Sequence, residues 1–406
     1  MSTAPEIVPA TPSATEIDRA SLCLPNRLTS YAISGLRQCW MPTLGRYSYR
    51  FRFGVPEQCN QFLPEGSAFY TLNVLLGISQ LRQFAGWEYL NLKDTYHGCC
   101  SELRSPTTRI YALGMALWVG ARFDIEPAGW LIDRVEAILG DRQRLQRLSA
   151  QDLGMLLSGC TALALRESQR WRAAAEVLSL MLRDHLHNPV SHLFYNQSIG
   201  YRRRFASFAS QVYSILALYQ FADAFGVEWA LDIANGAAQR TIQLQGPRGE
   251  WGWLYYVPNA KVVDFYEIYS VHQHGMAPAF LHCAVEHGVP GAREALVKGF
   301  LWLFGDNEMG VSMLRPKSQM FYRSQVRKAE LGSARRRARR AVFNAILGRG
   351  DHVARHRGLL LRPECRSYEL GWILWSFGAR DDYAELTQRS EFAFEQNTLL
   401  SSFSNS

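Results

Sequence analysis

Long apolar runs are absent from this sequence of 406 residues. No stretch approaches the roughly 20 uncharged apolar residues that a membrane span requires. Residues 1–18 are acidic and rich in Pro, Ala and Thr, with neither the basic start nor the apolar stretch of a signal peptide. We therefore expect a cytoplasmic protein with disordered tails at residues 1–25 and 401–406.

Several sequence motifs of catalysis are also absent. The chain has no phosphate-binding loop, no nucleophile elbow and no dinucleotide fingerprint. Its eight cysteines show neither a C-x-x-C pair nor a zinc-like spacing, so we expect reduced thiols. Histidine pairs at His185/His187 and His272/His274 offer potential metal ligands, but no zinc-site motif accompanies them. We expect neither a metal nor another cofactor.

Positive charge is concentrated in one segment. The net charge is +8, yet residues 323–357 alone contain eleven Lys and Arg against two acidic residues. The rest of the chain is thus close to neutral, and we do not expect a nucleic-acid partner.

The same segment has apolar residues at roughly helical spacing, namely Val326, Ala329, Ala341, Phe343 and Ile346. This pattern predicts an inserted basic amphipathic helix at about 323–357 that binds an acidic polymer or an anionic membrane, at its inner face. A solvated surface helix is the alternative. In either case we expect arginines 335–340 to be dispensable for folding the rest of the chain.

Residues that typically begin or end helices are abundant in the sequence. Six apolar helices are predicted to begin near residues 67, 105, 149, 207, 278 and 367, at Ser or Pro. Ser149 and Asp152, for example, form a capping-box pattern. Helices that are apolar on nearly all sides must be surrounded by other elements. An amphipathic stretch follows each of them, at about 94–103, 127–140, 168–186, 227–243, 290–304 and 382–397. This alternation predicts six helical hairpins that close into a ring.

Strand patterns are few. WGWLYY (251–256) and KVVDFYEIY (261–269) predict an inserted β-hairpin at about 250–270, and YSYRFRF (47–53) suits a further strand. The predicted fold class is all-α, with a single toroid domain over residues 26–400.

This arrangement resembles the (α/α)6 toroids of the six-hairpin glycosidase superfamily, which includes glycoside hydrolases, polysaccharide lyases and sugar epimerases. It also resembles the toroids of terpenoid cyclases and prenyltransferases. Residues 249–278 and 362–372 are similar to uncharacterised bacterial toroid proteins associated with surface-polysaccharide synthesis. The resemblance implies a carbohydrate-active lyase, epimerase or hydrolase that acts on an acidic bacterial polysaccharide or oligosaccharide.

The N-terminal ends of the inner helices should meet at one rim, where helix dipoles favour a polar or anionic ligand. Acids, phenols and imidazoles there can move protons, arginines can bind a uronate carboxylate, and aromatic faces can stack on sugars. The candidate catalytic residues are Asp264, Tyr269, His272, His274 and Glu364. The candidate substrate-binding residues are Arg204, Tyr213, Trp251, Trp253, Glu267, Arg366, Tyr368 and Trp372.

Other interpretations stay open at this point. Hydrolysis requires Asp264 and Glu364 to face each other, about 6.5–9.5 Å apart for an inverting enzyme. A second interpretation is a terpenoid cyclase-like enzyme. The sequence lacks the DxDD motif of that class and has only a DDxxE-like stretch at 381–385 and one QW-like match at 245–251. A non-catalytic glycan-binding protein is the third interpretation. Many of the listed side chains would then be core residues, caps or solvated surface.

Overall fold

The computed structural model describes residues 26–54, 59–81, 87, 89–166, 169–200, 202–331, 333–352 and 356–393. The two expected tails, 1–25 and 401–406, lie outside these residues. Over the described part of the chain, no helix has the length and apolar character needed to cross a bilayer.

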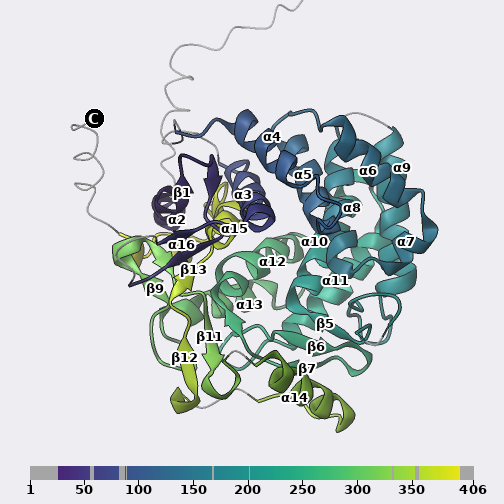
Figure 1. Cartoon of the computed structure of the whole chain (residues 1–406). Coiled ribbons are helices and arrows are strands. Elements are labelled where there is room, and N and C mark those ends of the chain that lie inside the picture. Colours follow the sequence, from purple (N-terminus) through teal and green to yellow (C-terminus); the bar gives the residue numbers. More distant parts are fainter. Residues whose placement is uncertain are drawn as a thin grey trace, which may run out of the picture.

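Six helices form the inner wall of a ring (Figure 1). They are α3 (Pro64–Ile78), α5 (Ile110–Arg122), α8 (Ala150–Ala164), α10 (Phe208–Phe225), α12 (Ala277–Glu286) and α15 (Ser367–Phe377). Each packs against the next, and α15 packs against α3, so the ring closes. Small residues permit this close packing: a Cβ on Gly371 of α15 would lie 2.8 Å from the Cα of Val74 of α3. The predicted all-α ring is confirmed.

Five outer helices follow their inner partners along the chain, as predicted. They are α4 (Leu92–Glu102), α6 (Gly129–Leu139), α9 (Gln169–Met181), α11 (Glu228–Gln243) and α13 (Ala292–Leu301); the short α7 (Arg142–Arg147) follows α6.

The sixth outer position was predicted wrongly. At 382–397, the described residues form only α16 (Ala384–Thr387) and the 3-10 turn η8 (Ser390–Phe392). The outer helix that packs against α15 is α2 (Arg27–Cys39), from the other end of the chain (Figure 1). It buries Leu28, Tyr31, Ala32 and Leu36, a helical stripe that faces the ring.

Helix ends follow their capping residues in two of three instructive cases. The Ser149–Asp152 capping box begins α8, and Ser207 begins α10, which ends at Gly226 in the left-handed conformation. The start predicted at residue 105 was wrong, because α5 begins at Ile110. Arg134 of α6 donates hydrogen bonds to the carbonyl oxygens of residues 105, 106 and 108, which holds this stretch in turns.

Short antiparallel sheets lie at the N-terminal ends of three inner helices. One has the order β5-β6-β7: β5 (Phe205–Ser207), β6 (Leu254–Tyr256) and β7 (Lys261–Asp264). The second has the order β12-β11-β8: β12 (Leu359–Leu361), β11 (Ser324–Arg327) and β8 (Ile268–Tyr269). The third has the order β13-β3-β4: β13 (Glu364–Cys365), β3 (Arg50–Arg52) and β4 (Asn60–Gln61). Strands β5, β8 and β13 lead into α10, α12 and α15, so they deliver side chains to the rim of the ring.

The strand predictions are largely confirmed. The hairpin predicted at 250–270 is β6–β7, in which Tyr255 pairs with Val262. Residues 47–53 contribute to β3 and to β2 (Arg46–Tyr47), which pairs with β1 (Trp40–Met41). A further pair, β9 (Leu314–Arg315) and β10 (Met320–Phe321), was not anticipated.

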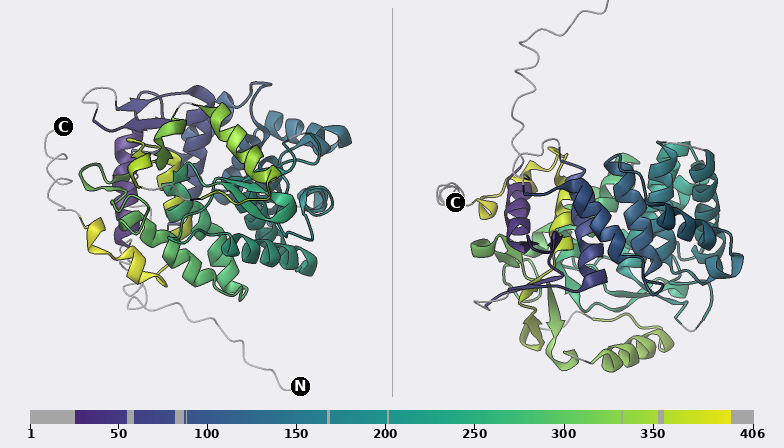
Figure 2. Two further views of the ribbon diagram at one scale, coloured as in Figure 1. Left: turned by 90° about the horizontal axis from the view of Figure 1, so that it is seen from below. Right: turned by 45° about the horizontal axis from the view of Figure 1, so that its top comes forward.

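The basic segment is only partly helical. Helix α14 (Ala334–Ile346) lies at the edge of the molecule, beside β7 (Figures 1 and 2). Residues 324–327 are strand β11, which pairs with β8 on one side and β12 on the other. The prediction that Val326 belongs to the amphipathic helix was therefore wrong, because these strand partners lie far from it in sequence.

Candidate functional site

Three aromatic side chains meet where β8 leads into α12. Tyr269 is the last residue of β8, and His272 begins η3 (His272–Met276), a π-helical turn before α12. The indole of Trp253 lies parallel to the imidazole of His272, with ring centroids 6.2 Å apart and an interplanar angle of 4°. The ring of Tyr269 lies 5.2 Å from each of them. The structure thus brings these three predicted site residues together.

Arg323 extends this aromatic group toward the sixth inner helix. Its guanidinium carbon lies 5.1 Å from the ring centroid of Tyr269. Its Nη1 lies 3.3 Å from Oε1 of Glu364, at the start of β13. Both side chains are largely buried, with 14% and 10% of their surfaces exposed. Arg323 is therefore a buried cation between a phenol and a carboxylate.

Two further arginines hold Glu364. Arg366 donates from Nε (3.1 Å) and Nη2 (2.9 Å) to Oε1 of Glu364. Nε of Arg50, on β3, lies 3.1 Å from Oε2. The guanidinium of Arg366 also lies 4.2 Å from the ring centroid of Tyr49. One carboxylate thus faces three guanidinium groups, which leaves an excess of positive charge.

Tyrosines continue the wall across the ring. Tyr49 stacks on Tyr70 of α3, with centroids 4.9 Å apart, and Tyr70 lies 4.4 Å from Tyr368 of α15. Farther along, Tyr213 of α10 lies 5.9 Å from Trp372 of α15. Burial raises the pKa values of Tyr70 and Tyr269, so both phenols are protonated at neutral pH. We call the following residues the rim cluster: Tyr49, Tyr70, Trp253, Tyr269, His272, Arg323, Glu364, Arg366, Tyr368 and Glu369.

His272 is the neutral imidazole of the rim cluster. Burial, with a smaller effect from Arg323, lowers its pKa to about 3. Its Nδ1 is buried and has no hydrogen-bond partner among the described residues. A neutral imidazole with an unoccupied nitrogen can accept a proton from a ligand, which makes His272 a candidate base.

Glu369 is a site residue that sequence reasoning missed. It lies fully buried in the first turn of α15. Burial raises its pKa to about 8, although Arg323 and Arg366 act in the opposite direction. The side chain is thus mostly protonated at pH 7 and can donate a proton. The sequence does contain a signal for this residue, because an acidic side chain in the first turn of a helix that is apolar on all sides is expected to be buried.

This raised pKa predicts a specific pH dependence of stability. Between its ordinary pKa near 4.5 and the folded value near 8, Glu369 holds a proton in the folded state that it releases on unfolding. Its contribution to stability therefore decreases as pH rises through this range. Glu369→Gln removes the ionisation, so we expect a smaller fall in melting temperature between pH 5 and pH 9 than in the parent. Glu294→Gln, at an exposed position of α13, is the control. Equal slopes for Glu369→Gln and the parent would contradict the prediction.

Asp264 and Glu267 are bound to arginines outside the rim cluster. Asp264 is bonded to Arg340 and lies 3.5 Å from Arg327, and burial raises its pKa to about 6. Glu267 accepts hydrogen bonds from Ser324 (2.9 Å) and Arg362 (3.0 Å), and Nη1 of Arg337 lies 3.5 Å away. These contacts suit residues that anchor the basic segment to the ring.

Three other predicted residues also lie apart from the rim cluster. The ring of His274 packs 4.7 Å from Phe321, inside the wall. Trp251 is fully buried and stacks on Phe208, with centroids 5.4 Å apart. Arg204 is exposed, with Nη1 3.5 Å from the hydroxyl of Tyr256. His274 and Trp251 are thus buried core residues. Arg204 lies on the outer surface, beside α14.

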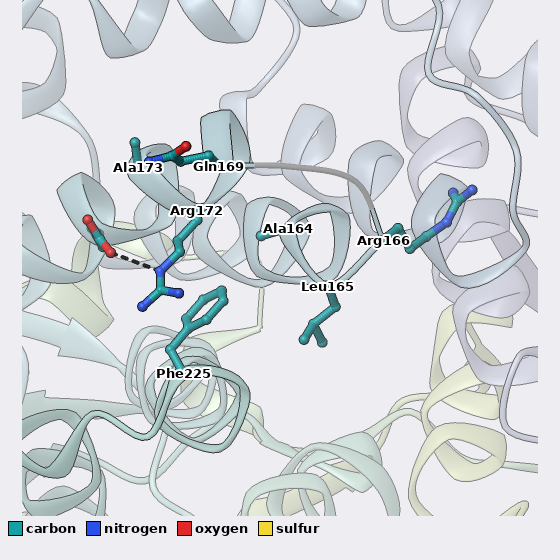
Figure 3. A pocket seen from close by; sticks show the side chains of 8 residues that line it. Ala164, Leu165, Arg166, Gln169, Arg172, Ala173 and Phe225 are labelled. Carbon is teal, nitrogen blue, oxygen red and sulfur yellow. Dashed lines mark hydrogen bonds and ion pairs between the residues drawn. The ribbon is translucent and has the colours of Figure 1, made fainter.

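A cavity of about 600 Å³ lies elsewhere, between α8, α9 and the end of α10 (Figure 3). Nε of Arg172 donates to Glu176 at 3.2 Å, and its guanidinium lies 5.0 Å from the ring centroid of Phe225. Arg166 is paired with Asp124. Because these charged groups already have partners, we assign no ligand to this cavity.

The described part of the chain contains no cluster of metal ligands and no disulfide. There, no three His, Cys, Asp or Glu side chains are placed to hold one metal ion, and seven cysteines are free thiols. Within the DDxxE-like stretch, Asp382 pairs with Arg380 and Glu385 pairs with Arg293.

Comparisons with known proteins identify the fold. No family model matches the sequence, and no curated protein is detectably similar to it. Among solved structures, a cellobiose 2-epimerase from Bacillus thermoamylovorans B4167 has a TM-score of 0.58 at 9% identity, covering 87% of this chain and 99% of its own. A polysaccharide lyase has a TM-score of 0.55 at 12% identity, covering 88% and 97%. A possible member of the GH105 family from Salmonella enterica serovar Paratyphi A has a TM-score of 0.55 at 10% identity, covering 92% and 96%.

The fold is the (α/α)6 toroid. It is shared with six-hairpin glycosidase-like enzymes, as the sequence patterns predicted. At these identities the similarity is one of fold, so function has to be argued from the rim cluster itself.

Proposed function

We propose that this toroid is a carbohydrate-active enzyme that binds an acidic sugar at the rim cluster and transfers a proton, as a lyase or an epimerase does. The observation that carries the proposal is the buried guanidinium of Arg323 over the ring of Tyr269, with the neutral His272 beside it. These groups combine an anion-binding cation, a phenol and an unprotonated imidazole at one place.

The charge of the rim cluster supports an anionic substrate. Arg50, Arg323 and Arg366 surround the carboxylate of Glu364, while Glu369 is mostly protonated. The N-terminal ends of the inner helices add positive potential. A uronate carboxylate therefore finds excess positive charge and guanidinium donors, and tyrosine and tryptophan faces offer contacts for its ring.

Proton transfer follows from this geometry. An arginine that neutralises the substrate carboxylate makes the adjacent C–H bond more acidic, and Nδ1 of His272 accepts that proton. The bound anion also offsets Arg323, which removes one of the smaller causes that lower the pKa of His272. The phenol of Tyr269 then gives its proton to the leaving oxygen in elimination, or to the opposite face of the carbon in epimerisation.

Hydrolysis by paired carboxylates fits less well. Asp264 is bonded to Arg340 and Glu364 to Arg366, so each carboxylate is held in an ion pair of its own. A general acid needs a proton and a nucleophile needs free access to the sugar, and these pairs oppose both.

The test compares acidic oligosaccharides with the same oligosaccharides after carboxyl reduction. We expect formation of an unsaturated or epimerised product from the acidic form. We expect no detectable elimination or epimerisation of the reduced form, because the adjacent C–H bond is no longer acidified and the charge-assisted hydrogen bonds to arginine are lost. Equal turnover of both forms would contradict an acidic substrate, and release of reducing sugar without unsaturation or inversion would favour hydrolysis.

We also propose that the protein works at the inner face of an anionic membrane, held there by helix α14 of the basic segment 323–357. Exposed arginines on α14, together with exposed apolar side chains beside them, support this placement.

A further inference from the structure

Helix α14 and the β5–β6 strands border a groove of about 620 Å³ at the outer surface of the ring. Its apolar lining comes from both sides: Ile199, Phe205, Tyr256, Val342, Ala345 and Ile346. Arg203 and Arg204 line it as well. Figure 2 shows α14 at the periphery of the molecule, so this groove is on the outside.

Helix α14 presents polar side chains to the ring and apolar side chains to solvent, whereas an ordinary surface helix does the opposite. Its inner face carries polar groups: Arg340 is bonded to Asp264, and Nδ2 of Asn344 donates to the carbonyl oxygen of Val263 at 3.0 Å. Its outer face carries Phe343 and Ile346, which are 60% and 76% exposed. An amphipathic helix that was formed only to cover the ring would bury these two side chains.

Further apolar side chains extend the exposed surface. Val342 and Leu347 of the same segment are 44% and 43% exposed, and Ile199, which lines the groove, is 55% exposed. Contiguous apolar surface of this kind on a globular protein marks an interaction site.

The charge around this surface indicates the kind of partner. Arg335, Arg336 and Arg339 are exposed on the preceding turns of α14, and no acidic residue occurs in this helix. Arg203 and Arg204 are exposed on the opposite side of the groove. Apolar side chains bordered by arginines suit an anionic lipid bilayer, in which phosphates and acyl chains occur together.

We propose that the α14 groove docks on the surface of an anionic phospholipid bilayer. Phe343 and Ile346 enter the acyl region, the groove accommodates an acyl chain, and lipid phosphates contact the bordering arginines. This inference rests on the proposed work at a membrane and deepens it by naming the lipid contacts. Residues 264–269 connect the strand that α14 covers to Tyr269, so docking places the bilayer on this side of the rim cluster.

The experiment is co-sedimentation of the full chain with vesicles of phosphatidylcholine, with or without phosphatidylglycerol, at 0.1 M and 1 M salt. We expect binding only to the anionic vesicles, and weaker binding at 1 M salt because the Debye length falls from about 10 Å to about 3 Å. The triple variant Arg335→Gln/Arg336→Gln/Arg339→Gln should bind roughly a hundredfold more weakly, at about fivefold for each charge. Phe343→Ser/Ile346→Ser keeps every charge and should bind at least about tenfold more weakly.

Leu165→Ser/Val177→Ser is the matched control, since these apolar side chains are also exposed but lie at the C-terminal end of α8 and on α9 of the ring. It should bind like the parent. Docking is overturned if the parent does not bind anionic vesicles at 0.1 M salt, or if Phe343→Ser/Ile346→Ser binds as well as the parent. It is also overturned if the parent is a dimer that this variant converts to a monomer, because a second copy then covers the face. Because binding needs no turnover, these results are independent of the enzyme assay.

Discussion

Tyr269→Phe is expected to reduce kcat by about 10²- to 10⁴-fold on an acidic oligosaccharide, the range for loss of a general acid or base. The substitution removes only the phenolic oxygen. The ring remains, so its contacts with Trp253 and His272 and its packing under the guanidinium of Arg323 are kept, while the hydrogen bond between the phenolic oxygen and Arg323 is lost. The free energy of unfolding should therefore fall by no more than about 3 kcal/mol, the upper range for one hydrogen bond to a charged group.

Tyr255→Phe is a closely matched control for this experiment. Tyr255 is fully buried on β6, and its hydroxyl has no hydrogen-bond partner among the described residues. The same oxygen is lost there, from a tyrosine outside the rim cluster, so activity should stay near that of the parent. If Tyr269→Phe retains full turnover, or if both variants lose it equally, the phenol of Tyr269 has no part in proton transfer.

Arg340→Met is expected to lower the free energy of unfolding by about 3–5 kcal/mol, the range for removing one partner of a buried ion pair. Arg340 is bonded to Asp264 and Glu330, and its Nε lies 3.7 Å from Asp351. These three carboxylates have at most 9% of their side-chain surface exposed, and without Arg340 the only cation that pairs with them among the described residues is Arg327. Denaturant unfolding monitored by circular dichroism measures the loss.

The cost should also depend on pH. Burial already raises the pKa of Asp264 to about 6, and the loss of Arg340 raises it further. Below about pH 6 the folded parent and the folded variant both hold this proton, so the deficit of the variant relative to the parent grows as pH rises above about 6. Arg339→Met, at the neighbouring exposed position, should stay within about 0.5 kcal/mol of the parent. Equal stability of the two variants would show that these ion pairs contribute nothing.

This expectation replaces the simpler prediction that arginines 335–340 can all be removed without harm to the ring. Their charges are indistinguishable in sequence. The structure separates them, because Arg337 and Arg340 face buried carboxylates while Arg335, Arg336 and Arg339 face solvent. The ion pairs of Asp264 and Glu267 could not be predicted for the same reason, because their arginine partners lie 57 or more positions away, as does Ser324.

Much of the ring was predictable because its signals are local. Apolar composition on all sides, together with caps such as Ser149–Asp152, indicates a surrounded helix without knowledge of its neighbours. The meeting of Tyr269, His272 and Trp253 followed from the same local reasoning, since all three precede one inner helix. Arg323 was missed because it begins a run of cations, and nothing local distinguishes a buried arginine from an exposed one.

The closure of the ring by α2 has a consequence for how the chain is made. The side chain of Asn26, which caps α2, donates to the carbonyl oxygen of Phe377, 351 positions later. At about 5–20 residues per second, α2 leaves the ribosome on the order of 20–70 s before the helix that it packs against has been synthesised. During that time its apolar stripe needs a temporary cover, such as a chaperone. A circular permutant that begins before α3 and carries α2 after α16 would remove this wait for α2, although the contact between α3 and α15 would still join distant parts of the chain.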